Sequence, residues 1–332
     1  MKEILIILDG FMEEYFEGHS FKKLLFGDRD LKFIEREEDF SVKGKDLDSL
    51  NCIFNILGYD SSKEDIGERS FYEGFNRGIK LKDKEGIYRC NIVRVEDGVL
   101  KDFTGGDLDE SIGEVLKDFK IDGGCIYPGY KYKNLLLLDE IIAEDLNPPH
   151  FNVGKDIGQI IPRNKRLKKI IDCSYEFFKE RGQEGLMLWP WGASEKVELR
   201  EYNKGTALVG GIDLVCGMGK ALGMKVVQPK GATGDFDSNL NEKLQCVLEY
   251  IEEVNNIIVH VNGFDELAHR RNFEGKIKFL EKTKRELLFP LLDIKDITIK
   301  ITCDHRTDSL SGRHEKGKVP YLSVFNWQYL SI

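Results

Sequence analysis

The N-terminal stretch Ile4-Leu5-Ile6-Ile7-Leu8, followed at once by Asp9-Gly10, gives the first indication of the fold class. Five consecutive apolar residues, three of them β-branched, predict a short strand that is buried on both faces, as in a parallel sheet covered by helices. Open α/β sheets place their sites at the carboxyl ends of such strands. Asp9 stands at that point and is therefore a candidate site residue, although a turn-forming Asp is the simpler alternative.

The same alternation of strand and helix returns in the C-terminal half. Strands are expected at 225–228, 257–261 and 297–301, and helices at 213–222, at 241–254 and, after residue 265, as far as 280. This order predicts an α/β fold with a doubly wound, mostly parallel sheet. His260 lies within an expected strand and is interpreted as a core histidine rather than a ligand.

The composition is that of an ordinary globular protein. The 332 residues suggest about two domains, and the net charge of −9 argues against a protein that binds the phosphate backbone of nucleic acids. No run of ~18 apolar residues occurs, so no membrane span is expected. The cysteines are odd in number and form no CxxC pair, which favours the cytoplasm over a disulfide framework. They are Cys52, Cys90, Cys125, Cys173, Cys216, Cys246 and Cys303.

Carboxylates and imidazoles gather at the expected strand ends. Asp265 and His269 are four residues apart, so on a helix they share one face. Asp304 and His305 directly follow a strand, and His314 comes soon after them in a polar loop. Mixed imidazole and carboxylate ligands suit Mn²⁺ or Zn²⁺, with Mg²⁺ as a further candidate. The set is larger than one four-coordinate ion needs, so we expect two divalent ions. Taken singly, each residue could instead be a helix cap, a surface histidine or a turn residue.

Several separate motifs occur along the chain in a fixed order. They are Leu8-Asp9-Gly10, Asp48-Ser49, Ile56-Leu57-Gly58-Tyr59-Asp60, Tyr88-Arg89-Cys90-Asn91, Pro148-Pro149-His150, Trp189-Pro190-Trp191-Gly192, Gly231-Ala232-Thr233-Gly234, Asp265-Glu266-Leu267-Ala268-His269 and Asp304-His305-Arg306-Thr307. In these motifs the chain resembles the archaeal-type cofactor-independent (2,3-bisphosphoglycerate-independent) phosphoglycerate mutases of the alkaline phosphatase superfamily. The resemblance implies an enzyme, a metal-dependent phosphomutase of glycolysis with an alkaline phosphatase-like core.

The resemblance also implies two domains. Residues 1–84 and 186–332 would form a discontinuous metal-binding core, and residues 85–185 an inserted, smaller α/β cap that binds substrate. Four cap residues take substrate-binding roles by resemblance: Arg89, Asn91, Lys133 and His150. An arginine fork is suited to bidentate recognition of phosphate or carboxylate. A surface ion pair is the alternative for Arg89.

Two metal ions and a serine nucleophile complete the implied site. By resemblance, one ion is held by Asp265, His269 and His314, and the other by Asp9, Asp304, His305 and the hydroxyl of Ser49. A serine hydroxyl is a poor nucleophile at neutral pH, and metal coordination favours its alkoxide. The alternative for Ser49 is a helix N-cap. The two interpretations are compatible, because a helix N-terminus also favours a bound phosphate.

The implied reaction interconverts 2- and 3-phosphoglycerate without bisphosphoglycerate. The phosphate passes to Ser49, the glycerate re-orients, and the phosphate returns to the other hydroxyl. The expected partner is a small phosphorylated substrate in the cytoplasm, with no nucleic acid and no membrane involved. The oligomeric state is left open.

Several cap positions depart from the family's pattern. Lys133 stands where an Arg is typical, Phe151 where an Asp is typical, and Ala193-Ser194-Glu195 where a Gln-Gly-Arg is typical. The predicted metal ligands are intact while anion-binding groups are fewer. Two alternatives therefore stay open: a metal-dependent phosphatase or phosphomutase acting on another small phosphate ester, and a non-catalytic homologue that binds a metabolite.

Overall fold

The computed structural model describes residues 2–326, which form two compact units. Unit 1 comprises the chain up to Ile66 and from Leu199 onward, and unit 2 comprises Gly67–Glu198. The boundaries expected from the sequence, at 84/85 and 185/186, both lie inside unit 2. The reason is that Ser70 and the strand pairing around residue 191 tie the flanking segments to residues 87–94. The roles of metal-binding core and substrate cap stay predictions.

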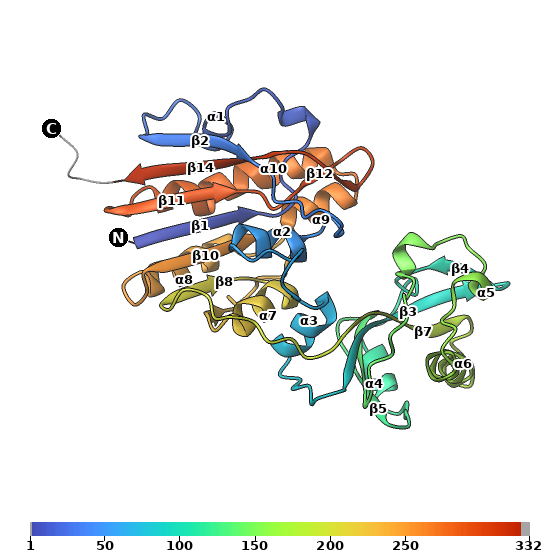
Figure 1. Cartoon of the computed structure of the whole chain (residues 1–332). Helices are drawn as coiled ribbons and strands as arrows, with labels where there is room; N and C mark the ends of the chain where they lie inside the picture. The colour runs from blue at the N-terminus through green and yellow to red at the C-terminus, as the bar shows by residue number, and fades with distance from the viewer. Residues whose placement is uncertain (1, 327–332) are drawn as a thin grey trace. The chain divides into compact units, whose positions relative to one another are not determined.

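A seven-stranded sheet forms the centre of unit 1 (Figure 1). Its order is β2-β14-β11-β1-β10-β8-β9. The bounds are β1 (Lys2–Leu8), β2 (Phe33–Glu38), β8 (Thr206–Val209), β9 (Lys225–Val227), β10 (Asn256–Val261), β11 (Ile297–Thr302) and β14 (Val319–Asn326). Among the described strands of this sheet only β14 runs against its neighbours, since it is antiparallel to β11 and β2 while the other pairs are parallel. The predicted mostly parallel sheet is confirmed.

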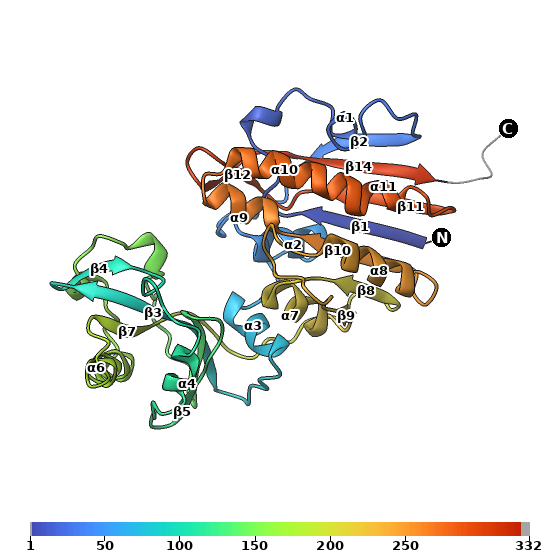
Figure 2. The ribbon, with the colours of Figure 1, turned by 180° about the vertical axis from the view of Figure 1, so that it is seen from behind.

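Helices cover both faces of this sheet, as the opposite views of Figures 1 and 2 show. On the face of Figure 1 lie α2 (Ser49–Ile56) and α7 (Asp213–Ala221). On the face of Figure 2 lie α8 (Leu240–Tyr250), α9 (Gly263–His269), α10 (Phe273–Thr283) and α11 (Phe289–Leu291). Alternate β1 residues Ile4, Ile6 and Leu8 are fully buried in one apolar cluster with residues of α8 and α10. The doubly wound α/β fold is therefore confirmed.

The single helix predicted to reach residue 280 is wrong. The structure has two helices, α9 and α10, separated at Arg270–Asn272. Arg271 adopts a φ of 55°, which ends α9, and the side chain of Asn272 caps α10 by accepting a hydrogen bond from Gly275 N. α9 is therefore a short helix that begins directly after β10 and carries Asp265 and His269.

Short elements complete unit 1. They are α1 (Phe21–Phe26), the 3₁₀-helix η1 (Glu14–Phe16), the π-helix η3 (Lys284–Leu288) and the antiparallel pair β12 (Arg306–Asp308) and β13 (Arg313–Glu315). No helix among the described residues has both the length and the apolar character that crossing a membrane requires.

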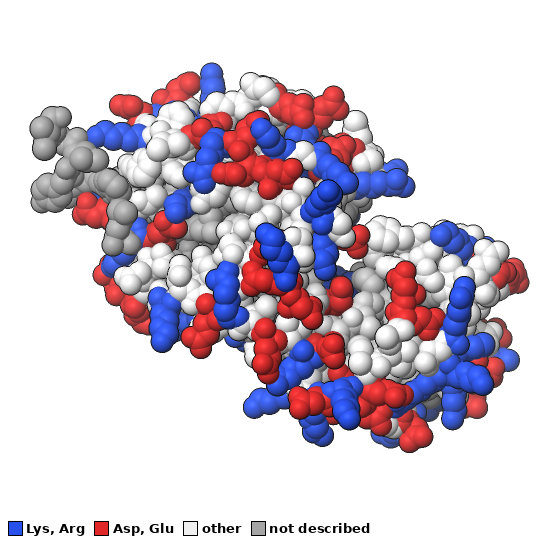
Figure 3. Space-filling model, in the orientation of Figure 1, with Lys and Arg blue, Asp and Glu red and all other residues white. Residues whose placement is uncertain are grey.

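Unit 2 is built on an entirely antiparallel sheet of order β4-β3-β6-β5, with β7 also paired to β3. Its elements are α3 (Arg69–Asn76), β3 (Gly86–Glu96), β4 (Val99–Asp102), α4 (Ile112–Leu116), β5 (Gly124–Tyr127), β6 (Lys133–Leu138), η2 (Pro149–Phe151), α5 (Ile157–Ile160), α6 (Lys165–Lys179) and β7 (Leu186–Ser194). On the face drawn in Figure 3, acidic and basic side chains are interspersed over both units.

Candidate metal centre and active site

The predicted metal ligands of unit 1 stand at one edge of its sheet. β1 lies between β10 and β11 and is parallel to both, so the carboxyl ends of the three strands meet. Asp9 follows β1, Asp265 and His269 lie on α9 after β10, and Asp304 and His305 follow β11. His314 lies on β13, whose pairing with β12 returns it to the same edge.

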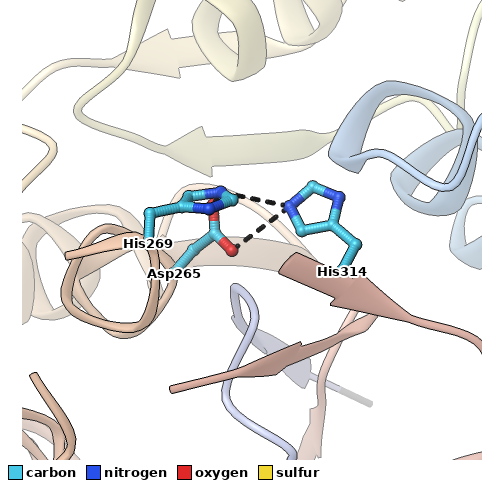
Figure 4. Close-up of side chains that lie close together, drawn as sticks. All are labelled: Asp265, His269 and His314. Atoms are coloured by element: carbon cyan, nitrogen blue, oxygen red, sulfur yellow. Dashed lines mark hydrogen bonds and ion pairs between the residues drawn. The ribbon is translucent and has the colours of Figure 1, made fainter. Parts of the chain in front are cut away.

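Asp265, His269 and His314 form the first cluster (Figure 4). Nε2 of His269 lies 3.1 Å from Asp265 Oδ2, Nε2 of His314 lies 3.4 Å from Asp265 Oδ1, and the two Nε2 atoms are 3.2 Å apart. The Nδ1 atoms are 2.9 and 2.7 Å from the carbonyl oxygens of Gly312 and Leu47. A carbonyl only accepts, so each Nδ1 carries a proton and Nε2 of each ring faces the carboxylate; in the neutral form of the ring, Nε2 offers a lone pair.

Three converging acceptors fit a bound cation. Burial raises the pKa of Asp265, but the two histidines outweigh burial and hold this pKa well below its usual range. Burial lowers the pKa of His269, yet Asp265 raises it to about 9, because a proton relieves the crowding of acceptors. A divalent ion would do the same, and two imidazole nitrogens with one carboxylate are a donor set that suits Zn²⁺ or Mn²⁺. This cluster is a candidate metal site.

The second cluster surrounds His305. Its Nε2 lies 3.3 Å from Asp304 Oδ2, 3.5 Å from Asp9 Oδ1 and 3.3 Å from Ser49 Oγ. Asp9, Asp265 and His305 also form a candidate metal-binding group, so Asp265 belongs to both clusters. The structure thus brings together every residue predicted to hold the second ion. Which ligand serves which ion stays a prediction.

Asp304 is held by the backbone in a way that suits a ligand. Its Oδ1 accepts hydrogen bonds from Gly10 N at 3.1 Å and His305 N at 2.9 Å. Its Oδ2 is buried and has no hydrogen-bond donor among the described residues, although it lies near His305. Buried carboxylate oxygens without a donor are costly, and a cation would remove that cost.

The backbone conformation and close contacts of residue 10 require a glycine directly after Asp9. Its φ is 61°, a left-handed conformation that glycine adopts without steric cost. A Cβ atom there would lie 2.5 Å from Asp265 Oδ1 and 2.6 Å from Thr307 Oγ1. The turn after β1 therefore needs glycine so that the carboxylate of Asp265 can approach the backbone.

Ser49 is the first residue of α2, and its side chain is buried among the predicted ligands. Its Oγ donates to Asp9 Oδ1 at 3.3 Å and lies 3.3 Å from His305 Nε2. The alternative of Ser49 as the N-cap is wrong, because Asp48 is extended and accepts the capping hydrogen bond from Asn51 N. The Ser49 hydroxyl is thus available for a role other than capping.

His260 is a site neighbour that the sequence interpretation treated as core only. It is fully buried, and its Nε2 lies 3.2 Å from Asp9 Oδ2. Burial lowers the pKa of His260 to about 3, so its ring is neutral at pH 7. The feature that could have indicated His260 as a site residue is its position near the end of β10, in register with Ile7 of the neighbouring strand.

In unit 2, three of the four predicted substrate residues, Arg89, Asn91 and His150, contact Trp191. The guanidinium carbon of Arg89 is 4.3 Å from the Trp191 ring centre, and the His150 ring centre is 5.2 Å away. Trp191 Nε1 donates to Asn91 Oδ1 at 2.9 Å, and Lys133 is the cross-strand partner of Asn91. The spacing of these residues along the sequence did not indicate that Trp191 contacts three of them.

Arg89 is also one half of a buried ion pair. Its Nε donates to Glu73 Oε2 at 3.1 Å, and Glu73 Oε1 accepts from Arg69 Nε at 2.7 Å. The Arg89 and Glu73 side chains are only 15% and 10% exposed. The alternative of an ion pair at Arg89 is therefore correct, but the pair is buried rather than at the surface. Glu73 was missed because its partner is sixteen residues away and on another element.

The chain matches two families over ranges that overlap in part. Residues 41–183 match the 2,3-bisphosphoglycerate-independent phosphoglycerate mutase family, and residues 138–326 match the metalloenzyme superfamily. The second match covers more than half of the chain.

Individual relatives agree with these family matches, and solved structures agree with the fold. A 2,3-bisphosphoglycerate-independent phosphoglycerate mutase of Methanothrix thermoacetophila is 29% identical over 84% of this chain and 76% of its own length. One of Pyrococcus furiosus is 26% identical over 97% and 87%. Two structures show a similar fold: the PH0037 protein from Pyrococcus horikoshii (TM-score 0.73, 20% identity, 98% and 87% coverage), and the cofactor-independent phosphoglycerate mutase from Thermoplasma acidophilum (TM-score 0.56, 16% identity, 98% and 90% coverage).

These matches confirm the predicted resemblance and the predicted enzyme class. They do not test individual site residues. The chain belongs to the metalloenzyme superfamily, and over most of its length it is similar to the archaeal-type 2,3-bisphosphoglycerate-independent phosphoglycerate mutases, which are isomerases.

Proposed function

We propose that this chain interconverts 2- and 3-phosphoglycerate through a phosphoserine at residue 49, without bisphosphoglycerate. One observation carries the proposal: a buried serine hydroxyl lies 3.3 Å from both Asp9 and His305, inside a set of acceptors that fits divalent cations. The substrate comes from the family matches, whose relatives are named as phosphoglycerate mutases. We infer that the reaction takes place in the cytoplasm on a small phosphorylated substrate.

The residues around Ser49 would have the following roles in the reaction. Asp9 accepts the hydrogen bond of the Ser49 hydroxyl and so orients its oxygen for attack. Ser49 is the first residue of α2, and the positive end of the helix dipole there favours a phosphate at that helix end. Two divalent ions, held by the residues assigned above, would favour the serine alkoxide and neutralise charge on the transferring phosphoryl group.

We assign substrate recognition in unit 2 to its charged residues Arg89 and Lys133. The guanidinium of Arg89 and the ammonium of Lys133 supply positive charge for the substrate's carboxylate or phosphate. Asn91 is buried and bonded to Trp191 and to the Phe103 carbonyl, so we assign it to fixing this surface. A mutase must retain the glycerate while the phosphoserine persists, which requires groups that bind the glycerate in addition to the serine.

The test is turnover of 3-phosphoglycerate by the purified chain with Mn²⁺, followed through an enolase-coupled assay without added bisphosphoglycerate. Ser49→Ala should abolish turnover and also the mass increase of a trapped phosphoenzyme, while Mn²⁺ binding persists. Ser62→Ala is the matched control, because Ser62 is an exposed loop residue that bonds only to Asp60 among the described residues. Undiminished phosphoenzyme in the Ser49 variant would place the nucleophile elsewhere.

A phosphatase of the same superfamily is the second candidate. Two observations favour it: Phe151 is 74% exposed where a carboxylate was expected, and the charge of Arg89 is shared with Glu73. Phe151 offers no acceptor for a glycerate hydroxyl, and Glu73 offsets part of the positive charge that would bind the glycerate carboxylate. A panel of small phosphate esters decides between the candidates, since free phosphate without isomer identifies a phosphatase and isomer without free phosphate identifies the mutase.

A further inference from the structure

We propose that Thr307 is a positioning residue whose single hydroxyl fixes Asp265 and His305 relative to each other, and thereby sets both candidate ion sites. The inference rests on the proposed metal centre but not on the identity of the phosphorylated substrate. It concerns a residue that the predicted ligand sets do not include.

The hydroxyl of Thr307 lies between one ligand of each cluster. Its Oγ1 donates to Asp265 Oδ1 at 2.7 Å and lies 3.1 Å from His305 Nδ1. A hydroxyl has one proton, and the ionised carboxylate can only accept it. The remaining lone pair of Oγ1 therefore accepts from His305, so Nδ1 of His305 carries the ring proton.

This proton placement decides what His305 offers to the second cluster. With Nδ1 protonated, the lone pair of the neutral ring is on Nε2. Nε2 is the atom that faces Ser49, Asp9 and Asp304. The opposite tautomer would point an N–H into the cluster and repel a cation.

His305 differs in this respect from the other two histidine ligands. Nδ1 of His269 and Nδ1 of His314 bond to backbone carbonyls, which no side-chain substitution removes. Nδ1 of His305 bonds to a side chain, so its orientation can be changed by one substitution. Residues that orient a metal-binding histidine in this way commonly change metal affinity 10–100-fold when they are replaced.

Thr307 is itself rigidly placed. It is fully buried, its N–H donates to Met12 O at 2.9 Å, and its carbonyl accepts from Lys276 Nζ at 3.0 Å. It is also the cross-strand partner of His314 in the β12–β13 pair. Thr307 therefore contacts the segments that carry Asp265, His305 and His314, and its hydroxyl direction is set by the fold.

The test is calorimetric titration of the metal-free full chain with Mn²⁺ and, separately, with Zn²⁺. The wild type should bind two ions. Thr307→Val, which keeps the shape and removes the hydroxyl, should bind at least one ion about 10–100-fold more weakly. Thr307→Ser keeps the hydroxyl and should bind close to wild type. Equal binding by Thr307→Val and wild type would overturn the proposal, as would an equal loss in Thr307→Ser.

A measurement on the wild type does not depend on the folding of a variant. In the Zn²⁺-loaded chain, ¹⁵N spectra of the six histidines should show His305 protonated at Nδ1, and protonation at Nε2 instead would refute the proposal. A wild type that binds no ion would refute it together with the metal centre. A wild type that binds two ions but lacks mutase activity would overturn only the proposed function.

Discussion

Replacing Glu73 by Gln should lower the unfolding free energy of unit 2. It should also make this free energy fall less steeply as the pH decreases. Burial raises the pKa of Glu73, but the guanidinium groups of Arg89 and Arg69 outweigh burial and lower this pKa from 4.5 to about 2. At roughly 1.4 kcal/mol per pKa unit, that difference corresponds to about 3 kcal/mol of folding free energy at pH 7. Removing one partner of a buried ion pair independently predicts about 3–5 kcal/mol.

The sign of the pH dependence follows from the lowered pKa. The stabilisation by ionised Glu73 is fully present above its ordinary pKa of 4.5 and is lost as the pH falls toward about 2. Gln has the shape of the protonated acid and does not titrate. The difference in unfolding free energy between the wild type and Glu73→Gln should therefore shrink from about 3 kcal/mol at pH 7 to about 1 kcal/mol at pH 3.

The assay is urea unfolding followed by tryptophan fluorescence. Trp189 and Trp191 lie on β7 beside this pair, while the third tryptophan, Trp327, lies outside the described residues. Glu114→Gln is the matched control, because Glu114 is an exposed unit-2 acid paired with Lys117 and should contribute less than about 1 kcal/mol. If Glu73→Gln unfolds like the control at pH 7, or if its deficit is the same at pH 3, the reasoning is wrong.

Three further predictions concern unit 1. Gly10→Ala should lower the unfolding free energy by about 1–3 kcal/mol and weaken Mn²⁺ binding, because the new Cβ meets Asp265 and Thr307 within 2.6 Å; urea unfolding and calorimetry would measure both, and an unchanged Mn²⁺ affinity would contradict it. Asp304→Asn should reduce the Mn²⁺ retained after dialysis from two ions to one, measured by elemental analysis, and retention of two would show that Asp304 is not a ligand. Lys276→Met should cost about 3–5 kcal/mol in urea unfolding, since it leaves Glu13, 2.7 Å from the fully buried Lys276 ammonium, without its cation; a loss under 1 kcal/mol would mean that the pair is nearly neutral for stability.

Local patterns in the chain were enough for the core of the fold and most of the site. The apolar run ending in Asp9 predicted a buried parallel strand with a functional end, and β1 has that place in the sheet. Asp265, His269, Asp304 and His305 were found because strand ends and the helical four-residue spacing are properties of neighbouring residues. Such properties depend only on residues that are close together in the sequence, so they can be predicted from it.

Relations between distant segments could not be predicted in this way. The hairpin that returns His314, the hydroxyl of Thr307 between two ligands, and the pairing of Glu73 with Arg89 all join groups on different elements. Their distances depend on strand register and on how helices pack, and neither has a local signature. Residue types and their order along the chain therefore predicted which chemistry to expect, whereas the proton positions and partners of those residues follow from tertiary packing, because a hydrogen bond requires atoms about 3 Å apart and in line.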